Sequence, residues 1–193
     1  MLENPQILAL DIETSNLFPD KGRIMCAVFM DIANGNKITV FREDNKKFRT
    51  KHTNDDKELV KTIRDFMKYA FIWISYFGRG FDIRFIQTRL RIAGEWPLEL
   101  RKHVDLYYYT GGSALKLERR SLRVLAERFD FKIGKRDVSF PDWMIAGNER
   151  YNPSCRKEYK KAIQEVVDHC IRDVELLSPA LMALYPFVGT IKR

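Results

Sequence analysis

Four acidic residues, from three distant parts of the sequence, have side chains that are suited to binding divalent cations. Asp11 and Glu13 follow a short apolar stretch, Asp82 follows two glycines, and Asp173 lies in the last long segment of helical character. Mg²⁺ and Mn²⁺ prefer oxygen ligands from several rigid elements, so carboxylates that are distant in sequence can share these ions. Two such ions side by side can cleave a phosphodiester. The spacing therefore predicts a site for two divalent cations, Mg²⁺ or Mn²⁺.

Each of these acids also has a plainer interpretation. Strand residues two apart share a face, so Asp11 and Glu13 can point together toward one ion. The opposite face of that strand is apolar, with Leu8, Leu10 and Ile12. The alternative is a solvated strand end, because Asp-x-Glu is a common pattern. For Asp82, the alternative is a helix-capping carboxylate.

His169 precedes Asp173 by about one helical turn, so both side chains project from the same helix face. A histidine titrates near neutral pH and can accept a proton from an attacking water or orient that water. This pairing suggests a role for His169 in water activation. The alternative is an ion pair on the helix surface.

The charge of the chain favours a polyanionic partner. Its 193 residues carry 34 Lys and Arg against 26 Asp and Glu, a net charge of +8, which steers nucleic acid toward the protein. Tyr107 could stack on unpaired bases while Arg119 and Arg120 meet phosphates. The alternatives are a partly buried tyrosine and solvated arginines. A content of 45% hydrophobic and 12% aromatic residues predicts one domain over residues 1–193.

Cysteine usage indicates a reducing compartment. Cys26, Cys155 and Cys170 form no C-x-x-C pair, which argues against a zinc ribbon and against a secreted disulfide framework. No stretch has the length and apolarity of a transmembrane helix, and no signal segment precedes the first strand. We expect a cytoplasmic protein without membrane association.

The order of predicted elements indicates an α/β fold. Strands are predicted at 7–12, 24–32, 37–42, 71–76 and 103–106, with turn residues Asn34, Gly35 and Asn36 joining the second to the third. Helices are predicted at 55–67, 81–93, 122–129 and 157–184, with a loop over 132–153. This order favours a mixed sheet of about five strands flanked by helices, and the ribonuclease H-like sheet fits it.

Three motifs resemble, in order, those of the proofreading exonuclease domain of family B DNA polymerases. Residues 10–19 resemble its first motif, 75–82 its second and 169–173 its third, and residues 103–106 and 121–126 resemble the connecting strand and helix. The resemblance covers nearly the whole chain. It implies a ribonuclease H-like member of the DEDD superfamily of 3′–5′ exonucleases, and we expect a free-standing nuclease without a polymerase palm.

The resemblance implies a two-metal exonuclease that releases nucleoside monophosphates from 3′ ends. Single-stranded DNA is the favoured substrate and RNA a second one; the sequence specifies no replication or repair partner. The metal ligands would be Asp11, Glu13, Asp82 and Asp173, and His169 would handle the attacking water. The expected nucleic-acid contacts are Thr14, Arg79, Phe81, Tyr107, Arg119 and Arg120.

Two positions depart from the family pattern. Phe77 stands where the family commonly has Asn. His169 lies four residues before Asp173, which is the tyrosine spacing of the polymerase-like branch, whereas the histidine branch usually places His five before. Two alternatives to the exonuclease follow: a catalytically weak module that binds nucleic acid or a partner, and a ribonuclease H-like endonuclease.

Overall fold

A mixed β-sheet forms the centre of the computed structural model, which describes residues 7–48, 55–112, 115–132, 137–150 and 152–188. The strands of this sheet are β1 (Ile7–Thr14), β2 (Ile24–Asp31), β3 (Lys37–Arg42), β4 (Ile72–Ser75) and β5 (Lys102–Asp105), in the spatial order β3-β2-β1-β4-β5. The first three strands are antiparallel, and β4 and β5 run parallel to β1. The predicted mixed sheet is confirmed.

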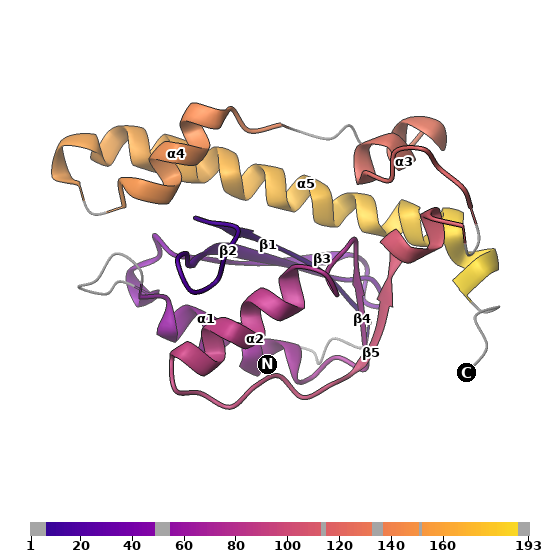
Figure 1. The fold of residues 1–193 in the computed structure, drawn as a ribbon, viewed down its shortest axis with the longest axis horizontal. Coiled ribbons are helices and arrows are strands. Elements are labelled where there is room, and N and C mark those ends of the chain that lie inside the picture. Colours follow the sequence, from indigo (N-terminus) through magenta and orange to yellow (C-terminus); the bar gives the residue numbers. More distant parts are fainter. Residues whose placement is uncertain (1–6, 49–54, 113–114, 133–136, 151, 189–193) are drawn as a thin grey trace.

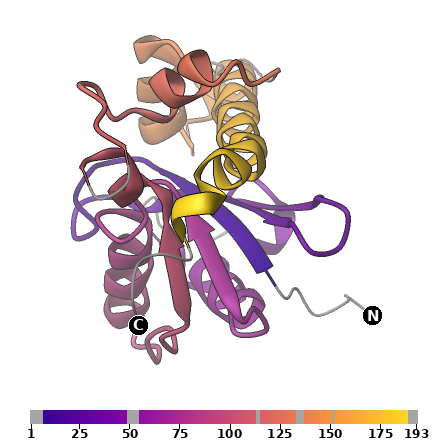
Figure 2. The ribbon, with the colours of Figure 1, turned by 90° about the vertical axis from the view of Figure 1, so that its right-hand side faces the viewer.

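Helices cover both faces of the sheet (Figure 1). They are α1 (Lys57–Met67), α2 (Asp82–Ile92), α3 (Leu122–Arg128), α4 (Phe140–Asn148) and α5 (Arg156–Val188), with 3-10 turns at Lys46–Phe48, Leu106–Thr110 and Pro153–Cys155. The helix α5 runs across one face together with α3 and α4, whereas α1 and α2 lie against the other, as the turned view in Figure 2 also shows. None of the helices in the described ranges is both long and apolar enough to cross a membrane.

The strand β2 shows why the sheet needs helices on both sides. All eight of its residues are buried, since its alternate side chains enter two separate apolar cores. The turn to β3 contains Gly35 and Asn36 with φ of 75° and 59°, the positive values that favour glycine and asparagine in tight hairpins. The predicted turn at this point is confirmed.

The prediction of a loop over 132–153 is wrong for its central part, which forms the helix α4. Ser139 begins this helix, and its Oγ accepts a hydrogen bond from the Asp142 amide at 3.2 Å. Pro141 lies in the first turn, where a missing N–H costs nothing, so it does not break the helix. Residues 133–136 and 151 of the predicted loop lie outside the described residues. The helix α5 likewise continues past Pro179 and past its predicted end at 184.

Candidate active site

The carboxyl end of β1 extends beyond its parallel neighbour, and Asp82 occupies the position beside it. Backbone pairing between β1 and β4 covers only Ile7 to Ala9. Farther along, the Ile12 amide donates to Asp82 Oδ1 at 3.0 Å instead of to a strand. Asp82 is buried, with 4% of its surface exposed. The helix-capping alternative is therefore incomplete, because this carboxylate also ties the start of α2 to β1.

Asp11 and Glu13 lie on the face of β1 that meets α5. The apolar side chains that alternate with them enter the opposite core, beside α1 and α2, as the sequence predicted. Across from them, the Cys170 thiol donates to Asp11 Oδ2 at 3.3 Å. One ligand atom each of Asp11, Glu13 and Cys170 lie within 4.8 Å of one another. The strand and the last helix therefore meet at this carboxylate pair.

His169 joins the same group of side chains. Its Nε2 atom lies 3.5 Å from Glu13 Oε1 and 4.0 Å from Asp173 Oδ2. Only 13% of the His169 side chain is exposed, and the Trp143 ring of α4 lies at a centroid distance of 6.2 Å. His169 is thus nearer to an acid of β1 than to its helical neighbour, unlike a simple surface ion pair. Sequence reasoning missed Trp143 because its helix was predicted as a loop.

The electrostatics of the site favour a bound cation. Burial, followed by the charges of Asp82, Glu13 and Asp173, raises the pKa of Asp11 well above its ordinary value. Burial is also the main reason that the pKa of Asp82 is raised to about 7, with Asp105 and Asp173 adding repulsion. Crowded carboxylates with little water lose free energy when they ionise, and a divalent cation offsets that loss. The carboxylate oxygens therefore fit a divalent cation that prefers oxygen ligands, and the Cys170 thiol lies beside them.

The loop between β4 and α2 is organised by Asp105, which the sequence reasoning did not assign to the site. Its buried carboxylate accepts the amides of Phe77 at 2.7 Å and Arg79 at 2.8 Å. Burial raises the pKa of Asp105, although these hydrogen bonds act to lower it. A Cβ at Gly78 would lie 2.3 Å from Ser75 Oγ, so the loop needs glycine there to pack. The one available signal was the position of Asp105 inside the strand motif at 103–106.

Two of the expected nucleic-acid contacts, Thr14 and Phe81, are sequence neighbours of the acids. Thr14 ends β1 one residue after Glu13, and its Oγ1 donates to Asn16 O at 2.9 Å. Phe81 directly precedes Asp82 and packs its ring 5.5 Å from that of Phe85. The Phe81 ring packs against the core beside α1 and α2, on the face of the sheet opposite Asp11 and Glu13.

The other expected contacts lie farther along the same edge of the sheet. The Arg120 guanidinium covers the Tyr107 ring at 3.8 Å and donates to Tyr107 O at 3.0 Å, so these two residues contact each other. Arg119 is exposed. Arg79 is also exposed, and its guanidinium donates to the His103 carbonyl at 2.5 Å. His103 itself bonds Ser75 Oγ through Nε2 at 2.7 Å, and burial lowers the pKa of His103 to about 4.

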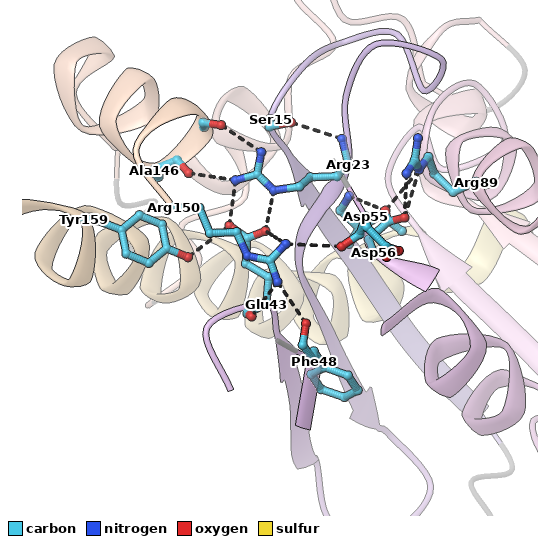
Figure 3. A network of polar contacts seen from close by, with 12 residues as sticks. Ser15, Arg23, Glu43, Phe48, Asp55, Asp56, Arg89, Ala146, Arg150 and Tyr159 are labelled. Carbon is cyan, nitrogen blue, oxygen red and sulfur yellow. Dashed lines mark hydrogen bonds and ion pairs between the residues drawn. The ribbon is translucent and has the colours of Figure 1, made fainter. Parts of the chain in front are cut away.

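A buried polar network fixes the frame around the site (Figure 3). Arg23 forms two bonds to the Glu43 carboxylate, at 2.5 and 2.9 Å, and donates to the carbonyls of Gly147 and Ala146 at the end of α4. The Arg23 amide bonds Ser15 Oγ, within the first motif, at 3.0 Å. The network therefore joins the β1–β2 loop to the helix that carries Trp143.

Comparison with known proteins assigns the family. A family model described as the RNase_H superfamily matches residues 8–185. The chain belongs to the RNase H superfamily. No curated protein sequence matches this RNase H superfamily member.

Among solved structures, the similar ones include the family B DNA polymerase from the hyperthermophilic archaeon Pyrobaculum calidifontis. The TM-score is 0.61 at 19% sequence identity, and the match covers 91% of this chain but 24% of the polymerase chain. The RNase H superfamily member described here thus spans about a quarter of that polymerase. At this identity the likeness shows a shared fold.

Proposed function

We propose that this RNase H superfamily member is a metal-dependent 3′–5′ exonuclease that removes nucleoside monophosphates from single-stranded 3′ ends. The observation that supports this most strongly is geometric, because carboxylates from β1, α2 and α5 meet at one place. Asp82 of α2 bonds the Ile12 amide, between Asp11 and Glu13 of β1, and His169 Nε2 lies 3.5 Å from Glu13 and 4.0 Å from Asp173 of α5. Carboxylates repel a phosphodiester unless a cation intervenes. A surface used only for binding nucleic acid would have no need of them.

Two divalent cations, Mg²⁺ or Mn²⁺, would be held by Asp11, Glu13, Asp82 and Asp173. When bound, such cations activate water and stabilise the charge of the leaving oxygen. The protein keeps its carboxylates in place before binding: Ile12 holds one oxygen of Asp82, and Cys170 contacts Asp11. This preorganisation reduces the reorganisation needed at the moment of reaction.

His169 would hold the proton that leaves the attacking water. Its Nε2 atom faces Glu13 and Asp173, and either carboxylate can stabilise the imidazolium that results. The Trp143 ring restricts solvent access on the side of α4. His169 therefore has the environment of a general base, although it stands at the spacing where the family resemblance expects tyrosine.

The substrate would be an unpaired strand, because a terminal nucleotide must leave the base stack to reach closely set carboxylates. Contacts to it are proposed from Thr14, Arg79, Phe81, Tyr107, Arg119 and Arg120. The net charge of +8 supplies general attraction for the phosphate backbone. Both DNA and RNA are included, with single-stranded DNA favoured.

The test is digestion of 5′-labelled single-stranded DNA and RNA with Mn²⁺, comparing the parent chain with Asp11→Asn. Stepwise shortening by the parent and an inert variant are expected. The matched control is Asp65→Asn, which removes a half-exposed acid from α1 and should leave digestion unchanged. Binding without cleavage by the parent would instead support a binding module.

Circular single strands separate the two nuclease alternatives. An exonuclease needs a free end, so circles should persist while linear strands of the same sequence are degraded. Opening of the circles by the parent chain, but not by Asp11→Asn, would show an endonuclease in place of the proposed exonuclease.

A further inference from the structure

Phe77 has an unusual combination of backbone and side-chain properties. Its φ is 68°, in the left-handed region that a bulky side chain rarely adopts. Its ring is 43% exposed, so the strained backbone does not serve to bury it. Strained residues of this kind persist where the surrounding structure holds them, and they concentrate at functional sites. The position of Phe77 therefore requires an explanation other than core packing.

The surrounding loop holds the Phe77 ring in one place. Its amide bonds the buried Asp105, and its carbonyl accepts the amides of Gly80 at 2.9 Å and Phe81 at 3.1 Å. The ring packs 4.7 Å from the Tyr107 ring in an edge arrangement. A Cβ at Gly80 would lie 2.4 Å from Phe77 Cζ, so only glycine leaves room for the ring there. The exposed ring is thus a rigid surface.

Phe77, Tyr107 and Tyr108 form an aromatic shelf at the carboxyl ends of β4 and β5. Tyr108 is 45% exposed and lies 5.7 Å from the Tyr107 ring, whose face Arg120 covers. Ligands of open α/β sheets bind outside the carboxyl ends of the strands. The backbone next to Phe77 approaches one of the acids, because a Cβ on the following residue, Gly78, would lie 3.4 Å from Asp82 Oδ2.

The charge beside the shelf matches an anionic strand. Arg79 is exposed two residues after Phe77, and Arg120 lies against Tyr107. Aromatic rings next to arginines are the surface on which single-stranded nucleic acid binds, since bases stack on the rings while phosphates meet the cations. A protein partner would need no such proximity to a group of acids.

We propose that Phe77 is a stacking surface for one unpaired base near the 3′ end of the substrate strand. This inference rests on the proposed exonuclease function and adds a residue that determines substrate binding. Stacking is tolerant of base identity, so the contact would select for unpaired structure over sequence. Because the ring is already fixed, little side-chain freedom is lost when a base stacks on it.

The experiment removes the Phe77 ring and one base of the strand, separately and in combination. Affinities for a labelled single-stranded oligonucleotide are measured in an Asp11→Asn background, which prevents digestion, with and without Phe77→Asn. Asparagine accepts a positive φ, so the backbone conformation is retained. The oligonucleotide is either intact or carries one abasic site at the last, second-last or third-last nucleotide.

The expected result is loss of the same interaction from either side. Phe77→Asn should weaken binding of the intact strand by about 5-fold to about 150-fold. For the chain that keeps Phe77, an abasic site at one of the three positions should weaken binding by a similar factor. For the chain with Phe77→Asn, the same abasic site should weaken binding little further. Equal abasic effects on both chains at all three positions would overturn the proposal.

Two further variants guard against a structural explanation. Phe71→Asn removes an equally large ring that is 74% exposed at the opposite end of β4, and it should leave affinity unchanged. Phe77→Tyr should retain most of the affinity because it keeps the ring. If Phe77→Asn does not fold, Phe77→Gly makes the same comparison, because glycine also accepts positive φ.

The two proposals fail differently. If the parent chain digests the strand but the abasic sites have the same effect with and without Phe77→Asn, the exonuclease proposal is retained and the stacking surface is refuted. If an abasic site weakens binding only when Phe77 is present, but the parent chain does not digest the strand, the exonuclease is refuted and the stacking surface belongs to a binding module.

Discussion

Burial of Asp82 should make the stability of the cation-free protein fall as the pH rises. The pKa of this carboxyl is raised from an ordinary 3.8 to about 7, mainly by burial. The folded protein thus holds the proton more tightly than the unfolded chain. The stabilising contribution is complete below the ordinary pKa and is lost as the pH rises through about 7. At about 1.36 kcal/mol per pH unit over about 3 units, the loss is about 4 kcal/mol.

The perturbation is Asp82→Asn. The carboxamide oxygen can still accept the Ile12 amide, which now lies 3.0 Å from Asp82 Oδ1, and it carries no charge. In acid, parent and variant should therefore have similar free energies of unfolding. At about pH 8 the variant should be more stable by up to about 4 kcal/mol.

The assay is urea unfolding of both chains in a chelator, at several pH values from about 4 to about 8. The difference between the two unfolding free energies reports the Asp82 carboxyl together with its repulsion of the neighbouring acids, because the remaining titrating groups are common to both chains. Asp65→Asn on α1, which removes a half-exposed acid, serves as the control and should change the free energy of unfolding by less than about 1 kcal/mol. A flat difference for Asp82→Asn, or a less stable variant at the alkaline end, would refute this reasoning.

Three further outcomes are expected. Mg²⁺ or Mn²⁺ at about 100 times its dissociation constant should stabilise the parent chain against thermal unfolding by about 2.7 kcal/mol. The same cation should leave the stability of Asp11→Asn nearly unchanged. A melting temperature of the parent that does not change with the cation would contradict the cation site. Replacing Arg23 with Met breaks its buried pair with Glu43 and should cost about 3–5 kcal/mol in urea unfolding. Arg42→Met, in a pair whose side chains are 26% and 23% exposed, should cost less than about 1 kcal/mol; similar losses would contradict a stabilising network. His169→Tyr should slow digestion by about 10²- to 10⁴-fold, because tyrosine is a poor acceptor for the proton of the attacking water; an unchanged rate would mean that His169 only positions water.

The order and type of most elements could be predicted from local patterns. The alternation in β1 placed Asp11 and Glu13 on one face because strand side chains alternate whatever they pack against. The helical spacing of His169 and Asp173 likewise placed both on one face of α5. Such periodicities are properties of the backbone, so they are readable before the fold is known.

The helix α4 could not be predicted in this way. Proline and glycine in its sequence indicated a loop, yet it is held by packing against α5 and by Arg23, which bonds the carbonyls at its end from more than a hundred residues away. Tertiary contacts of this kind override weak local preference. The position of Trp143 beside His169 was therefore not predictable either.

The sequence by itself determined which acids are candidates for binding cations and which strand or helix face presents them, since residue type and backbone period are local. Only the tertiary structure decided how those faces meet. It placed Asp82 where its carboxylate accepts the Ile12 amide, directed the Asp105 carboxylate to the loop before α2, and held the Phe77 ring exposed at a positive φ. Each of these arrangements depends on groups brought together from different elements, which a linear pattern does not contain. The burial that raises the pKa of Asp82 is likewise a property of the folded chain.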